Sequence, residues 1–243
     1  MPGLFRRWFG SSRGSSGEAA RGVREWAAAQ GHRFATIKGA EGFVVEPAGG
    51  AWRAEWGPSQ RDYIDGNELR VRADLGEAGD LQMLAATAPL VKRLEREVFE
   101  QFTEGTQTRI DDHTPEEMRW LVLYPKMPRA ALGPLRDRFG VLANRPAAAT
   151  MWLDGDLSRA LVASSGWLDE ATPLAIVVQR GRIVLRMTLA EPDPPALQAP
   201  IALAAVAIAA ARRVGAEVAQ GAIGSERPSG WETSTAVPPP GQA

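Results

Sequence analysis

Residues 51–75, AWRAEWGPSQRDYIDGNELRVRADL, contain the clearest structural pattern in the chain. Apolar and charged residues alternate strictly at both ends of this stretch, in residues 52–56 and 68–75. A period of two is typical of strands with one buried and one solvent-exposed face, as found in antiparallel sheets. We therefore predict an antiparallel hairpin with four buried side chains, Trp52, Trp56, Leu69 and Val71.

The connection between these strands, residues 57–67, has two interpretations. Turn-forming residues lie at both of its ends, in Gly57-Pro58 and in Asp65-Gly66-Asn67. As a ligand loop, it would offer hydrogen-bond donors to an anionic group from Arg61, Tyr63, Arg70 and Arg72. As a plain hairpin, its outer face would form cross-strand ion pairs among Arg53, Glu55, Glu68, Arg70, Arg72 and Asp74. The balance of three basic and three acidic residues favours the hairpin.

The composition is that of a soluble globular protein. The chain has 243 residues, of which 44% are hydrophobic and 23% charged, and its formal net charge is -1. Only Lys38, Lys92 and Lys126 among the 28 basic residues are lysine, a bias typical of a GC-rich bacterial genome. The arginine content is therefore no sign of nucleic-acid binding, and we expect no nucleic-acid partner.

Several chemistries are excluded by residue counts. The chain has no cysteine and only two histidines, His32 and His113, which excludes disulfides, thiol nucleophiles and cysteine-based metal sites. No dinucleotide-binding or phosphate-binding glycine motif is present, so no cofactor, no metal and no catalytic residue is predicted. The absence of cysteine fits a cytoplasmic protein, and residues 1–10 lack the apolar region of a signal peptide.

We predict an α+β fold of two small lobes, each an antiparallel sheet covered by helices. The predicted divisions are a flexible N-terminal segment and linker (1–17), a first lobe (18–104), a polar hinge (105–114), a second lobe (115–220) and a disordered Pro-rich tail (221–243). The stretches ELRVRADLGE (68–77) and RIVLRMTLAE (182–191) resemble each other, which raises a distant internal duplication as one interpretation.

Apolar spacing and turn residues place further elements along the chain. Helices are predicted over 18–30, over 80–103 with a kink or break at Pro89, and over 129–139, 155–165 and 196–214. Further strands are predicted over 33–38, 42–47, 120–125, 148–153, 173–179 and 182–189, the last two joined by a turn at Arg180-Gly181.

Histidine meets several carboxylates at one place, in the group Asp111, Asp112, His113, Glu116 and Glu117. Such a group can hold a divalent ion or act as an acid–base pair. The competing interpretation is structural, because Thr114 and Glu117 form a capping box and acids suit the first turn of a helix. This interpretation is favoured, since no known ligand spacing is matched.

Residues 4–9 combine apolar and basic side chains, Leu4, Phe5, Arg6, Arg7, Trp8 and Phe9. At helical spacing the four apolar residues share one face, as in a short interfacial anchor or a peptide that docks in a groove. Alternatively, these aromatics pack against the protein's own surface.

We expect a non-catalytic, cytoplasmic bacterial protein that binds another protein as an adaptor, with weak peripheral attachment to the inner membrane through residues 4–9. One alternative is an enzyme that uses carboxylates and arginines at the hinge between the lobes. Another is an anion-binding regulatory module that uses the 57–67 loop.

Overall fold

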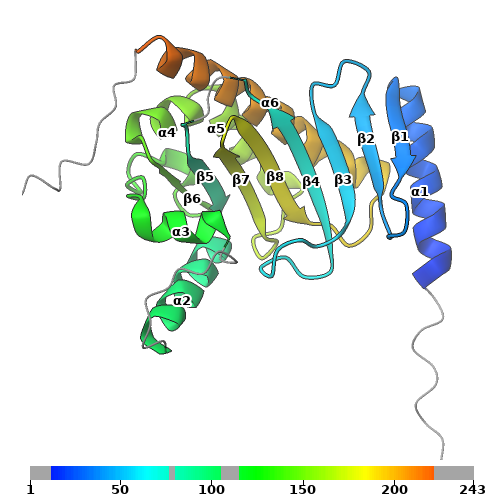
Figure 1. Cartoon of the computed structure of the whole chain (residues 1–243), viewed down its shortest axis with the longest axis horizontal. Helices are drawn as coiled ribbons and strands as arrows, with labels where there is room; N and C mark the ends of the chain where they lie inside the picture. Colours follow the sequence, from blue (N-terminus) through cyan, green and yellow to red (C-terminus); the bar gives the residue numbers. More distant parts are fainter. Residues whose placement is uncertain (1–11, 77–79, 105–114, 222–243) are drawn as a thin grey trace, which may run out of the picture.

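The computed structural model describes residues 12–76, 80–104 and 115–221 (Figure 1). Its strands are β1 (His32–Thr36), β2 (Phe43–Pro47), β3 (Arg53–Pro58), β4 (Asn67–Asp74), β5 (Met83–Thr87), β6 (Phe139–Ala143), β7 (Leu174–Gln179) and β8 (Arg182–Thr188). Its helices are α1 (Ser12–Ala29), α2 (Ala88–Glu104), α3 (Glu116–Leu123), α4 (Pro146–Leu153), α5 (Asp156–Ala163) and α6 (Pro194–Ala219). Two short 3-10 turns, η1 (Gly133–Leu135) and η2 (Ser164–Gly166), complete the elements.

All eight strands form one antiparallel sheet, in the order β1-β2-β3-β4-β8-β7-β5-β6. The predicted α+β class and antiparallel pairing are confirmed. The β3–β4 hairpin has the predicted register, with Trp56 opposite Leu69 and Ala54 opposite Val71. Trp56, Leu69 and Val71 are buried, and Trp52 is half-buried against the same core.

The prediction of a separate sheet in each lobe is wrong, because strands from both halves of the chain join one sheet. The junction is β4 with β8, which pair along their whole length from Glu68–Thr188 to Asp74–Arg182. Leu69 of β4 lies directly opposite Met187 of β8, so the pairing extends one apolar face across both halves. The proposed duplication is not confirmed, and the predicted hinge (105–114) lies outside the described residues.

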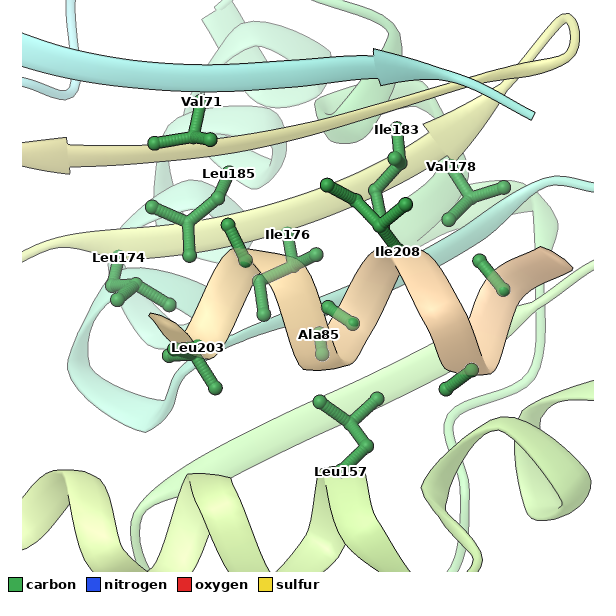
Figure 2. Packing of buried hydrophobic residues seen from close by; sticks show 14 of the residues in the cluster. Val71, Ala85, Leu157, Leu174, Ile176, Val178, Ile183, Leu185, Leu203 and Ile208 are labelled. Atoms are coloured by element: carbon green, nitrogen blue, oxygen red, sulfur yellow. The ribbon is translucent and has the colours of Figure 1, made fainter. Parts of the chain in front are cut away.

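One face of the sheet carries the larger core, which α1, α4, α5 and α6 cover. In Figure 1, α6 crosses behind the strands, and Figure 2 shows Leu203 and Ile208 of α6 between the sheet and Leu157 of α5. By length and composition alone α6 is apolar enough to cross a membrane, but half of its most apolar window is buried inside the protein. The predicted packed helix over residues 196–214 is confirmed.

The opposite face is covered at one end only. There α2 and α3 pack on β5 and β6 around a second core, and Figure 1 shows both helices at that end of the sheet. Within the described chain, no helix covers the same face of β1, β2 and β3. This face is therefore half apolar and covered, and half polar and open.

The predicted helix over 80–103 begins too early, because residues 83–87 form β5, the strand next to the edge strand β6. All five residues of β5 are buried between β6 and β7. Pro89 lies at the second position of α2, where a missing backbone N–H costs nothing, so it marks a helix start rather than a kink.

Four other elements differ from the prediction. Residues predicted as strands at 120–125 and 148–153 lie largely in α3 and α4, and the helix predicted over 129–139 is a set of turns around η1. Gly133, with φ +53°, and Pro134 interrupt helical structure there. At the N-terminus α1 begins at Ser12, inside the stretch predicted as a linker. Short apolar segments do not by themselves distinguish a strand from a buried helix.

One sheet with one main core predicts one cooperative unfolding transition. Leu69→Ala in β4 and Ile176→Ala in β7 each empty a fully buried site, so each should lower the free energy of unfolding by about 2–5 kcal/mol. Urea unfolding followed by tryptophan fluorescence and far-UV circular dichroism should give coincident transitions for both variants. Val162→Ala, at an exposed site on α5, is the control and should change little. Two separated transitions, each sensitive to only one variant, would contradict a single folding unit.

Candidate functional site

The open half of the sheet carries a surface that we call the charged face. Strand alternation places on it the side chains opposite to the larger core, and the pairing register aligns them across five strands. It consists of six arginines and four carboxylates: Arg33, Glu46, Arg53, Glu55, Glu68, Arg70, Arg72, Asp74, Arg182 and Arg186.

Glu68 is the inner anchor of the charged face. Its side chain is fully buried, and its carboxylate accepts three hydrogen bonds. Arg186 Nη1 donates to Oε1 over 2.7 Å, whereas Arg70 Nη1 and the backbone N–H of Gln60 donate to Oε2 over 3.2 and 3.0 Å. A buried charge is stable only when it is paired and hydrogen-bonded, and this arrangement meets that condition.

The connection between β3 and β4 covers this anchor instead of projecting into solvent. The Ser59 N–H donates to the Gly66 carbonyl over 3.0 Å, which closes the loop, and Arg70 Nη1 lies 3.4 Å from the Pro58 carbonyl. Tyr63 and Ile64 at its tip are buried in the second core with α2 and α3. The loop therefore ties the hairpin to the helical end of the same face.

Glu55 organises the outer part of the charged face. Its carboxylate lies 2.7 Å from Arg53 Nε, 3.0 Å from Arg72 Nη2 and 3.6 Å from Arg70 Nε. Burial would raise the pKa of Glu55, but the hydrogen bond from Arg53 and the charges of the three arginines outweigh it and hold the pKa below its ordinary value. The same hydrogen bond raises the pKa of Arg53. Glu55 is thus held as a carboxylate.

Around Glu46 and Glu55 the charged face is layered, with carboxylates beneath and guanidiniums above. Elsewhere on this face Arg70 is buried and Arg186 half-buried beside Glu68, and Asp74 is exposed. The side chains of Glu46, Glu55 and Glu68 are 24%, 12% and 0% exposed. In contrast, those of Arg33, Arg53 and Arg72 are 71%, 39% and 51% exposed. Because solvent meets the arginines first, this part of the sheet presents positive charge in a protein whose net charge is -1.

A shallow hollow of about 230 Å³ lies at the outer end of the charged face. It is lined by residues of β1, β2 and β3 and by the residue that follows β1. Arg33, Glu46 and Arg53 supply its charged side chains, and Ala35, Val44 and Ile37 supply apolar ones. Glu46 accepts from Arg53 over 2.6 Å and from Arg33 over 3.2 Å, so one carboxylate holds both arginines at the hollow.

The four residues predicted to offer donors to an anionic group are buried or already have partners within the protein. Tyr63 is buried, and Arg70 is buried against Glu55 and Glu68. Arg61 is half-buried and donates to the Gln60 carbonyl, and Arg72 pairs with Glu55. The cross-strand ion pairs expected of the hairpin are confirmed, and a ligand role for these four residues stays a prediction.

Two other candidate sites cannot be placed. Residues 4–9 and the group Asp111, Asp112 and His113 lie outside the described residues, so the predicted anchor and the alternative of an acid–base site are both untested. Within residues 12–76, 80–104 and 115–221, no group of three or more His, Asp or Glu side chains is placed to hold a metal ion.

Sequence reasoning missed the positive excess of this surface. It counted only the hairpin, where three basic and three acidic residues balance. The register adds Arg182 and Arg186 from β8, which lie opposite Asp74 and Arg70. It also adds Arg33 and Glu46 from the β1–β2 pair. The alternation in residues 182–188 was visible in the sequence, but nothing local indicated its partner strand.

Comparison with known proteins gives little guidance. No model of a protein family matches the chain, and no curated protein does. Among solved structures, the chain is similar to the crystal structure of the mycobacterial trehalose monomycolate transport factor A, TtfA, with 7% identity and a TM-score of 0.41. The match covers 81% of this chain and 93% of that one. A likeness of this extent carries no functional argument.

The structure predicts that Glu68 is essential to the charged face. Glu68→Gln keeps the shape of the side chain but leaves Arg70 and Arg186 short of a buried counter-charge, so we expect about 3–5 kcal/mol lower stability in urea unfolding. Asp74→Asn is the matched control, because its pair with Arg182 is exposed and should contribute little. Equal stabilities for the two variants would show that the buried pairing does not support the fold.

Proposed function

We propose that this chain is a non-catalytic, cytoplasmic binding protein, an adaptor that docks another protein on its charged face. The observation that carries the proposal is the layering of the outer part of that face, where the exposed Arg33, Arg53 and Arg72 are held by the less exposed carboxylates of Glu46 and Glu55. A side chain fixed in advance loses less conformational entropy when a partner binds than a freely rotating one. Complementary charge also raises the rate of encounter and selects the partner.

The fold supports this role by making the charged face rigid. Its strands lie on the larger core, and the 59–66 loop fastens one side of the face to the second core. Arg93 of α2 adds to this fastening, since its Nη2 donates to the Asp62 carbonyl over 3.3 Å. The arginines therefore sit on regular structure rather than on a mobile loop, which favours recognition without large rearrangement.

The test uses photo-crosslinking in cells, followed by binding with purified partner. A photo-crosslinking amino acid at position 35, in the hollow, should give a discrete adduct with one protein, whereas position 162 on α5 should not.

For the partner so identified, Arg53→Ala with Arg72→Ala should weaken binding about tenfold. Arg159→Ala, which removes an exposed arginine of α5, is the control and should leave the affinity unchanged. Equal affinities for the unmodified chain, the Arg53→Ala, Arg72→Ala variant and the Arg159→Ala control would refute docking on the charged face.

Attachment to the inner membrane through residues 4–9 is a second part of this proposal, and it rests on the sequence. The four apolar side chains can enter a headgroup region, each contributing about 1–2 kcal/mol after ordering costs. Arg6 and Arg7 would each add about 1 kcal/mol near an anionic leaflet. One short segment gives weak, reversible binding, so the protein partner would supply the second contact.

Deletion of residues 2–10 tests this attachment. The residues of α1 that pack on the core, Val23, Trp26 and Ala27, come later in the chain, so the melting temperature should not change. Co-sedimentation with anionic vesicles at low salt should be lost in the deletion variant. In the intact chain it should fall at high salt, because salt screens the two arginines. A large fall in melting temperature, or unchanged sedimentation, would mean that these residues do not act as an anchor.

A further inference from the structure

The hollow on the charged face is of a size to hold one side chain of a binding partner. Its volume of about 230 Å³ lies below the roughly 300–1,000 Å³ of pockets that enclose a small-molecule ligand. It is still several times the roughly 30 Å³ that one water molecule occupies in the liquid. The size therefore suits one apolar side chain of a larger partner better than a free metabolite.

The wall of the hollow combines apolar and basic character. Ala35 of β1 is exposed, and Val44 lies directly opposite it on β2. Arg33 and Arg53 stand over this apolar floor, both held by Glu46. The hollow is lined by residues of β1, β2 and β3, and β1 is the end strand of the sheet, so the hollow lies at that edge; Figure 1 shows the position of these three strands.

The two arginines at the hollow retain capacity for a further acceptor. Arg33 donates to Glu46 through Nη2, and Arg53 donates to Glu46 and Glu55 through Nη1 and Nε. A guanidinium carries five N–H donors in a planar fork that matches a carboxylate. A partner's carboxylate can therefore bind the outer side of each arginine while Glu46 keeps the inner side.

We propose that the partner segment bound by the charged face is an acidic peptide, with one apolar side chain seated in the hollow and flanking carboxylates on Arg33 and Arg53. This inference rests on the proposed function and specifies the chemistry of the partner. Glu46 and Glu55 lie between the arginines, so the face suits separate carboxylates better than the closely spaced phosphates of a nucleic acid. The basic segment at residues 4–9 has the wrong charge to be the occupant.

A substitution of Glu46 tests the inference, because tighter binding of an acidic peptide is not expected if Glu46 serves only the fold. The Glu46 carboxylate partly cancels the positive charge of Arg33 and Arg53 that an approaching acidic peptide meets, whereas a glutamine at this position would keep an oxygen that accepts from both arginines. Glu46→Gln should therefore tighten binding of an acidic peptide, by about threefold, the scale of an exposed ion pair. Removing both arginines, by Arg33→Gln with Arg53→Gln, should weaken it about tenfold.

The probe is a short fluorescent peptide of aspartate and glutamate around a single leucine, titrated by fluorescence anisotropy into the full chain. Two matched peptides accompany it, one with serine in place of leucine and one with lysine in place of the acids. We expect binding in the order acidic-leucine, acidic-serine, lysine-leucine, with a loss of affinity at high salt. Arg159→Gln on α5 is the control protein and should bind as the unmodified chain does.

Three outcomes would overturn the inference: no binding of the acidic peptide, equal binding by the Arg33→Gln, Arg53→Gln protein, or weaker binding by Glu46→Gln. Tighter binding of single-stranded RNA or anionic vesicles at the same arginines would assign the face to another class of partner. An arginine-dependent dimer in analytical ultracentrifugation would make a second copy the occupant. If only the peptide fails while the cross-linked partner still depends on Arg53 and Arg72, the proposed function stands and the acidic segment does not.

Discussion

The buried carboxylate of Glu68 is the constraint on which the polar half of the sheet depends. It joins β4 to β8 through Arg186, orients Arg70 toward Glu55, and receives the backbone N–H of Gln60 from the loop above. One side chain thus connects two distant parts of the chain and closes the loop that carries Tyr63 into the second core. Without a compensated charge there, Arg70 and Arg186 would lose the counter-charge that holds them in the inner part of the charged face.

The sheet face opposite to the larger core has two halves that differ in how their side chains are shielded from solvent. Over β5, β6 and β7, apolar side chains are covered by α2 and α3. Over β1 to β4 and β8, ion pairs run across the strands, and the carboxylates of Glu46, Glu55 and Glu68 take the inner positions. Surface ion pairs contribute little individually, but Glu55 meets three arginines at once, so its network is more ordered than isolated pairs would be. Such a network fixes the positions of the arginine side chains while adding little to the stability of the fold, which suits a recognition surface.

Local pattern predicted the parts of the fold that depend on neighbouring residues. The alternation at 52–56 and 68–75, the Arg180-Gly181 turn and the long alanine-rich helix were all correct. Failures occurred in the short apolar runs at 83–87, 120–123 and 148–153, since an apolar run of four to six residues fits a strand or a helix equally well. The charged face could be only half predicted, because its excess of arginine comes from strands that the register brings together over more than 100 residues of chain.

The long separation of β4 from β8 also has a consequence for the newly made chain. Glu68 and its partner Arg186 are 118 residues apart. At a synthesis rate of about 5–20 residues per second, β4 leaves the ribosome roughly ten seconds before the strand that completes it. During that interval its hydrogen-bonding edge and the apolar residues Leu69 and Val71 lack their final neighbours. Until β8 pairs with it, β4 therefore has an unpaired edge of the kind that can associate with other chains.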